Sequence, residues 1–424
     1  MIPMATTASK APNGLTFEQQ ATLTLSQLRA SLSALMGAIG ERTASEIRKA
    51  ADLQRALGIR TTLAWQVYKF VQAADPLTEA SNVPGAAAMK LLLQAAAKHG
   101  VPDGYVDDCT SALSDFEELI KVHAGDRNAF DTMISGVIGN GSDQIDSQQK
   151  RAAFRANSHL WGVQAKTRVA CYVYQPAKAD SRRLDVAVIR GLVGLRRLRR
   201  DASWTIARIG VSDDDGEVRQ PLVREPLDPA GEVAPGVPLL LKFSSHPLPT
   251  FRSVPAAFGM TNVQLEGDSI GNLSAVTCMV GDVSRNALAR YQDDHNRLQT
   301  SQALVRTPCE VLVHDVLVRD GTFGAISPTV AVYGDHRSGD AIPEGRECDL
   351  LPLRESVVYL GKGPSVMHTP DVPRYSEMIQ YAFDRLSWDG SRFEVYRCRV
   401  EYPVMPSSVV VRFDLPERPE PPKK

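Results

Sequence analysis

The spacing of possible nucleophiles and metal ligands gives little support to a catalytic function. Gly267-Asp-Ser-Ile-Gly271 matches the G-x-S-x-G pattern, which presents a nucleophilic serine when a strand precedes it and a helix follows. The residues after Gly271 are poor helix starters, so we expect a polar turn, although Asp349 and His368 occur in the order that a hydrolase needs. No H-E-x-x-H, H-x-H or C-x-x-C spacing occurs, and Gly361-Lys-Gly363 is not a complete phosphate-binding loop. We therefore expect that the protein is not an enzyme and has no catalytic residue, metal or cofactor.

A second chemistry, hydrogen bonding to nucleic acid, is indicated between Glu41 and Gln72. Six side chains in this segment are basic and three are acidic, whereas the whole chain has 48 Lys and Arg against 49 Asp and Glu. Guanidinium, hydroxyl and amide groups can read base edges in the major groove, and basic side chains can position a protein on phosphates. The groups suited to base edges are Arg60, Thr61, Thr62 and Gln66, and those suited to phosphates are Arg55 and Lys69. We predict that these six residues bind double-stranded DNA.

The stretch from Ala50 to Lys69 resembles the helix-turn-helix of bacterial transcription regulators. Apolar residues stand where two steeply crossing helices touch, namely Leu53, Leu57, Ile59, Ala64 and Val67. Gly58 stands at the turn, where a left-handed backbone suits glycine, and Thr61 or Thr62 is placed to cap the second helix. The resemblance implies that the second helix enters the major groove and that a dimer places two such helices roughly 34 Å apart. The alternatives are a helical hairpin that only packs on its neighbours and a protein-docking surface.

A second basic run follows much later in the chain. Between Arg182 and Arg200 there are seven arginines against the single acid Asp185, with apolar residues interspersed. This pattern predicts an amphipathic helix over residues 185–200. Such a helix would pair with acidic parts of the same chain, which we favour, or would contact phosphates, an anionic membrane or an acidic partner.

Composition limits the class of protein. The chain has 424 residues, 43% hydrophobic and 23% charged, which predicts two or three globular domains and excludes wholesale disorder. The net charge of -1 argues against a protein that coats polyanions. No apolar run is long enough to span a bilayer, and no secretory signal begins the chain, so we expect no membrane partner. Six scattered cysteines read as buried thiols in a reducing compartment, and we expect the protein in the cytoplasm.

Hydrophobic periodicity gives the elements that must position these groups. The expected fold class is α+β, an all-helical N-terminal domain followed by a mostly antiparallel β-rich domain resembling a sandwich or barrel. The expected divisions are a flexible N-terminus (1–14), a helical domain (15–145) with the helix-turn-helix at about 43–72, a β-rich domain (160–415) and a Pro-rich tail (416–424). The expected strands are 168–174, 238–243, 310–318, 329–333, 356–360, 393–402 and 409–413. Helical insertions are expected at 185–200 and 374–386.

These observations lead to one preferred hypothesis and two others. We expect a cytoplasmic, bacterial-type transcriptional regulator that binds DNA through its N-terminal helices, with a C-terminal domain for homo-oligomerisation or sensing. The alternative is a non-enzymatic structural or protein-interaction protein whose helical N-terminus is an assembly module. The third hypothesis, an enzyme whose site is assembled from distant residues, has only Ser269 in its favour.

Overall fold

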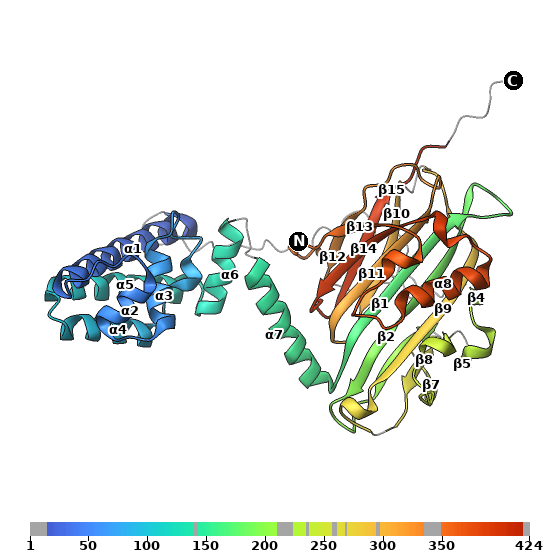
Figure 1. Ribbon diagram of the computed structural model, residues 1–424, viewed down its shortest axis with the longest axis horizontal. Helices are drawn as coiled ribbons and strands as arrows, with labels where there is room; N and C mark the ends of the chain where they lie inside the picture. Colours follow the sequence, from blue (N-terminus) through green and yellow to red (C-terminus); the bar gives the residue numbers. More distant parts are fainter. Residues whose placement is uncertain are drawn as a thin grey trace, which may run out of the picture. The chain divides into compact units, whose positions relative to one another are not determined.

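The order of helices and strands along the chain agrees with the α+β expectation (Figure 1). The structure is a computed structural model that describes residues 15–138, 143–209, 224–234, 237–256, 261–267, 269–293, 297–334 and 349–418. The expectations for residues 1–14 and for the end of the Pro-rich tail lie outside these ranges. The chain divides into two compact units, Met1–Ser142 and Asp143–Lys424.

The first unit is helical throughout its described part. Its helices are α1 (Phe17–Arg42), α2 (Ala50–Leu57), α3 (Thr61–Val71), α4 (Ala86–Lys98), α5 (Asp103–His123) and α6 (Arg127–Ile138). A capping box starts α1, since Thr16 and Gln19 each accept a hydrogen bond from the other's backbone N–H. The apolar stripe of α1 is fully buried in the core of this unit, as its spacing predicts.

The second unit begins with α7 (Asp143–Trp161) and is then mostly strands. A seven-stranded sheet has the order β13-β14-β11-β1-β2-β9-β4, in which only the β1–β11 pair is parallel among the described strands. Its strands are β1 (Val163–Pro176), β2 (Arg183–Arg197), β4 (Arg224–Pro226), β9 (Val276–Ala289), β11 (Cys309–Arg319), β13 (Val357–Lys362) and β14 (Phe393–Glu401). The expectation of a mostly antiparallel β-rich region is therefore confirmed.

Smaller sheets and one helix complete this unit. One sheet contains β10 (Leu298–Val305), β15 (Ser407–Asp414) and β12 (Thr329–Tyr333), and another contains β3 (Trp204–Ile209), β8 (Thr261–Leu265) and β7 (Phe251–Pro255). A two-stranded sheet pairs β5 (Glu232–Ala234) with β6 (Val237–Pro238). One face of the large sheet packs on the β10-β15-β12 sheet, and the other face packs on α8 (Tyr375–Leu386), which Figure 1 shows lying across the strands.

Two of the sequence expectations for this unit are wrong. Residues 183–197 form the strand β2 and not a helix, and β2 lies between β1 and β9 inside the large sheet. Gly191 shows why this place needs a glycine, because a Cβ there would lie 2.2 Å from the carbonyl oxygen of Cys278. In the expected strand 238–243, only Pro238 belongs to a strand, and Leu241–Phe243 is a 3-10 helix. The helix expected at 374–386 is confirmed as α8.

The described cysteines fit the expectation of buried thiols. They are free and buried, and burial raises the pKa of each: Cys109, Cys171, Cys278, Cys309 and Cys398. Cys348 lies outside the described residues.

A buried ion pair links β11 to β14 under α8. The Nε and Nη2 groups of Arg397 donate to the two carboxylate oxygens of Asp315, each at 2.8 Å, and Nη2 also donates to the carbonyl of Met367 at 3.0 Å. The Asp315 side chain has no exposed surface, and the Tyr375 ring lies under the guanidinium. Because burial of an unpaired charge is costly, each partner depends on the other.

A buried histidine on the opposite face of β11 makes the stability of the second unit depend on pH. Burial, assisted by the charge of Arg168, lowers the pKa of His314 to about 3. In the unfolded chain the pKa of histidine is about 6.5, so the unfolded state binds one more proton between these two values. His314 therefore stabilises the fold above about pH 6.5, and this contribution is lost as the pH falls, by up to about 1.4 kcal/mol per pH unit.

We therefore expect a difference between wild type and His314→Gln that shrinks on acidification. Urea unfolding from about pH 7 to about pH 5 measures it, because the variant lacks the protonation of the unfolded state. Two stability profiles that run parallel over this range would show that His314 makes no such contribution.

Candidate nucleic-acid interface

The segment predicted to contact DNA folds as two short helices joined by a tight turn. Gly58 ends α2 in the left-handed conformation, with φ 65° and its N–H bonded to the carbonyl of Gln54 at 2.8 Å. The two helices join the core of the first unit through the buried side chains Leu53, Leu57, Leu63, Ala64, Val67 and Phe70. Ile59, in the turn, is half-buried. This packing orients α3 and leaves its opposite face to solvent.

The outward face of α3 carries most of the predicted groups. Arg60, Thr61, Thr62 and Lys69 are exposed and Gln66 is half-buried, while Arg55 is exposed on α2. Their places on α3 alternate with the buried Leu63, Ala64, Val67 and Phe70 at helical spacing. The first unit therefore presents a row of hydrogen-bond donors along one side of one helix.

The N-terminal end of α3 combines an exposed cation with backbone donors that no described side chain caps. Arg60 is the N-cap residue and its side chain makes no capping bond, so the expectation that Thr61 or Thr62 caps the helix is wrong. Among the described residues, no carboxylate lies within ion-pair distance of the Arg60 guanidinium. The first N–H groups of a helix lack intrahelical acceptors and carry partial positive charge. This end of α3 is suited to a phosphate or to acceptor atoms of bases.

The two predicted phosphate contacts have carboxylate neighbours in the same unit. Arg55 pairs with Asp52 on α2, and Lys69 pairs with Glu79 at 3.2 Å while its Nζ lies 5.1 Å from the centre of the Trp65 ring. The Arg55 and Lys69 side chains are well exposed. The carboxylates of Asp52 and Glu79 are only 14% and 23% exposed, so a phosphate would reach the two cations from their solvent side.

Trp65 belongs to the same surface and was missed in the sequence analysis. It is 48% exposed, although it is large and apolar, and it lies one turn after Thr61. Its exposure could have been predicted from the sequence, because Trp65 lies opposite the apolar stripe of α3. An exposed ring there offers an apolar contact such as a thymine methyl group requires.

The turn glycine gives a test of how this segment is built. A side chain at Gly58 would meet nothing within 4 Å, so a substitution costs only the left-handed backbone conformation. We expect Gly58→Ala to destabilise the first unit by about 1–2 kcal/mol in thermal or urea unfolding.

A matched control is available in the same unit. Gly37 also has no atom within 4 Å of an added Cβ, but it lies inside α1 with an ordinary helical backbone. Gly37→Ala should be neutral or stabilising by up to about 1 kcal/mol. If Gly58→Ala and Gly37→Ala changed the stability equally, the left-handed backbone at Gly58 would not explain the effect.

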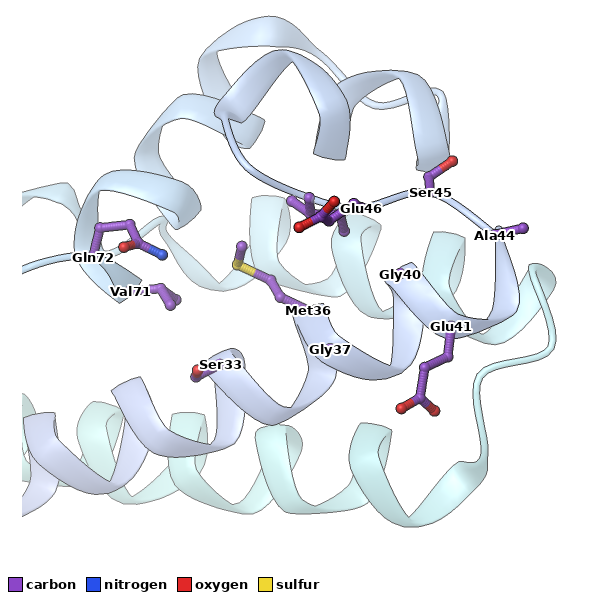
Figure 2. A pocket seen from close by; sticks show the side chains of 11 residues that line it. Ser33, Met36, Gly37, Gly40, Glu41, Ala44, Ser45, Glu46, Val71 and Gln72 are labelled. Carbon is purple, nitrogen blue, oxygen red and sulfur yellow. The ribbon is translucent and has the colours of Figure 1, made fainter.

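Two hollows lie on the described surface of the first unit. A groove of about 500 Å³ is bordered by α1, by the loop after it and by the end of α3, and Figure 2 shows Met36 extending into it from α1. None of the six predicted DNA-binding residues lines this groove. A second hollow of about 510 Å³ includes Arg55, together with Arg42, Glu46, Asp52 and His99. Neither hollow joins a nucleophile to a hydrogen-bonded base among the described residues.

The described residues bring together no catalytic or metal site of the kinds considered. Ser269 is exposed in a loop that leads to the 3-10 helix Asn272–Ser274 and not to an α-helix, and Asp268 lies outside the described residues. Within the described ranges, no three His, Cys, Asp or Glu side chains are grouped as metal ligands would be. In the same ranges, no helix has both the length and the apolar surface needed to cross a bilayer.

Comparison with known proteins adds no assignment. No protein-family model matches the chain, and no curated protein matches it.

Proposed function

We propose that the protein is a DNA-binding transcriptional regulator and that α3 is its recognition helix. The observation that carries this proposal is the outward face of α3, where Arg60, Thr61 and Thr62 are exposed at the N-terminal end of the helix. A helix of this kind places its first residues against base edges when it lies in the major groove. The proposed base contacts are Arg60, Thr61, Thr62 and Gln66, and the proposed phosphate contacts are Arg55 and Lys69.

Charge and packing support this assignment over a purely structural role for the two helices. A hairpin that only packs on its neighbours does not need an arginine that lacks a carboxylate partner among the described residues. Arg60 is such an arginine, and it lies beside the exposed Thr61, Thr62 and Trp65. The carboxylates near Arg55 and Lys69 hold these side chains at exposed places, where a phosphate can contact the same cations. The second unit takes the role of oligomerisation or sensing in this proposal, and a homodimer would present two copies of α3.

Fluorescence anisotropy with a random-sequence duplex at roughly 50 and 200 mM salt tests the proposal. If Arg55 and Lys69 of each subunit in a dimer neutralise four phosphates, the affinity should fall by about 100-fold between the two conditions. The variant Arg55→Gln/Lys69→Gln should bind more weakly and with a flatter dependence on salt.

The same experiment separates the regulator from the alternative function. Absence of binding at the lower salt concentration, or binding that ignores salt, contradicts the regulator proposal. The helical unit would then be better explained as an assembly module.

A further inference from the structure

Four polar side chains surround one small residue on the inner face of the large sheet. Ala170 of β1 lies beside His314 of β11 and beside Arg190 of β2 in the strand register. Arg168 and Tyr172 flank Ala170 on β1, and alternate residues of a strand share one face. Strand pairing therefore gathers two arginines, a tyrosine and a histidine around a residue that has only a methyl group.

Positive charge exceeds negative charge at this place. The Arg190 guanidinium lies 2.8 Å from the buried carboxylate of Asp282, which is also 4.0 Å from Arg224. Arg168 has no carboxylate within ion-pair distance among the described residues. Burial and the neighbouring charge of Arg190 lower the pKa of Arg168 to about 10, so it remains charged at neutral pH. The Asp282 carboxylate thus pairs with Arg190 and Arg224, and Arg168 adds a positive charge that no described carboxylate balances.

The hydrogen-bonding capacity of Arg168 is mostly unused. A guanidinium has five N–H donors, and within the described part of the chain that of Arg168 makes one hydrogen bond, from Nη1 to the carbonyl of Gly191 at 3.2 Å. Arg168 and Arg190 are both half-buried, so their side chains are partly screened from water. Two such groups on adjacent strands match the oxygens of a phosphate or carboxylate.

A second, independent sign of a missing partner comes from His314. Its side chain has no exposed surface, and Nε2 is hydrogen-bonded to the Ser301 hydroxyl of β10 at 3.1 Å. The other ring nitrogen, Nδ1, is buried and has no hydrogen-bond partner among the described residues. Buried polar atoms are nearly always paired, so this atom marks a place where a water or a ligand group belongs.

We propose that the face around Arg168, Arg190 and His314 is a binding site for a small molecule that carries an oxyanion, either a phosphate or a carboxylate. The oxyanion accepts hydrogen bonds from the two guanidinium groups, and a hydroxyl of the ligand or a bound water reaches Nδ1 of His314. This site lies in the second unit alone. The proposal does not depend on DNA binding, so the result of the DNA-binding experiment neither supports nor contradicts it.

Calorimetric titration of the full chain with inorganic phosphate, and separately with citrate, tests the proposal at an ionic strength kept constant with sodium chloride. We expect saturable binding of at least one of the two, and the stronger one identifies the oxyanion class. Arg168→Gln should weaken that binding at least tenfold, because charge-assisted bonds to the oxyanion are lost. Arg252→Gln, which removes an exposed arginine of β7, should leave it unchanged.

Arg168→Lys keeps the test decisive if the glutamine variant does not fold. Lysine retains the charge but lacks the planar fork, so binding should weaken at least threefold while circular dichroism stays that of the wild type. Absence of saturable binding to both anions, or unchanged affinity in a folded Arg168 variant, overturns the proposal.

Discussion

Arg60→Ala should lower the affinity for a selected DNA site by about 10- to 100-fold, the effect expected for the loss of one arginine contact to a base. This large effect is expected because of the position of Arg60. Arg60 is exposed at the start of α3, and no described carboxylate competes for its guanidinium. Its removal leaves no buried group unpaired, so thermal unfolding should be unchanged. Replacing Gln66 with alanine as well should abolish discrimination between the selected site and a random duplex.

The matched control is a lysine of the same unit. Lys90 is exposed on α4, and Lys90→Ala removes one positive charge away from α3. It should change affinity by much less than Arg60→Ala, and equally for selected and random duplexes. If the two variants lose affinity to the same extent, binding is a general charge effect and α3 does not read the sequence.

Arg397→Ala should produce the largest loss of stability that we expect, about 3–5 kcal/mol in the unfolding of the second unit. The substitution leaves the Asp315 carboxylate buried without its two charge-assisted hydrogen bonds. Burial already acts to raise the pKa of Asp315, and Arg397 opposes that shift. Urea unfolding followed by tryptophan fluorescence reports this unit, which contains Trp161, Trp204 and Trp388.

Two further variants test whether the unpaired buried carboxylate of Asp315 causes the loss of stability in Arg397→Ala. Arg399, on the same strand, pairs with Asp371 at 2.7 Å, but its side chain is 40% exposed and the Asp371 carboxylate also accepts a hydrogen bond from the Thr369 hydroxyl, so Arg399→Ala should cost clearly less than Arg397→Ala. Arg397→Leu/Asp315→Leu removes both charges and should recover most of the loss. If the double variant is as unstable as Arg397→Ala, packing and not the unpaired carboxylate explains the effect.

Local signals were sufficient for the helical unit. The run from Ala86 to Lys98 is rich in alanine and is followed by Gly100 and Pro102, and these residues are enough to bound α4. The leucines of α1 recur three or four residues apart, which is enough to define its buried stripe. Both depend on residues within a few positions of each other. The same kind of information indicated which side of α3 faces away from the core.

The β2 error shows where local signals fail. Val186 and Leu192 of β2 face one core, while Ala187, Ile189 and Val193 face the other. A strand buried on both faces has no polar alternation, so its apolar residues fall at helical spacing by coincidence. Its arginines are distributed by the register to partners far away in sequence, such as Asp282, which no local pattern reveals.

The proposed interface was also only partly visible in the sequence. Exposure of the α3 face follows from its pattern, but the pairing of Lys69 with Glu79 needs the fold, and Trp65 was passed over because large apolar residues usually belong to the core. The oxyanion site needs the pairing of three strands. Residues 168, 190 and 314 are brought together only by that register.

Oxidative footprinting of tryptophan tests the placement of α3 most directly. Trp65 is 48% exposed on α3, and Trp161, in the second unit, is 53% exposed and serves as an internal control. Addition of duplex DNA to the full chain should protect Trp65 from hydroxyl-radical oxidation and leave Trp161 unchanged, as read by mass spectrometry. DNA that binds while Trp65 remains fully reactive would contradict the assignment of α3 as the recognition helix.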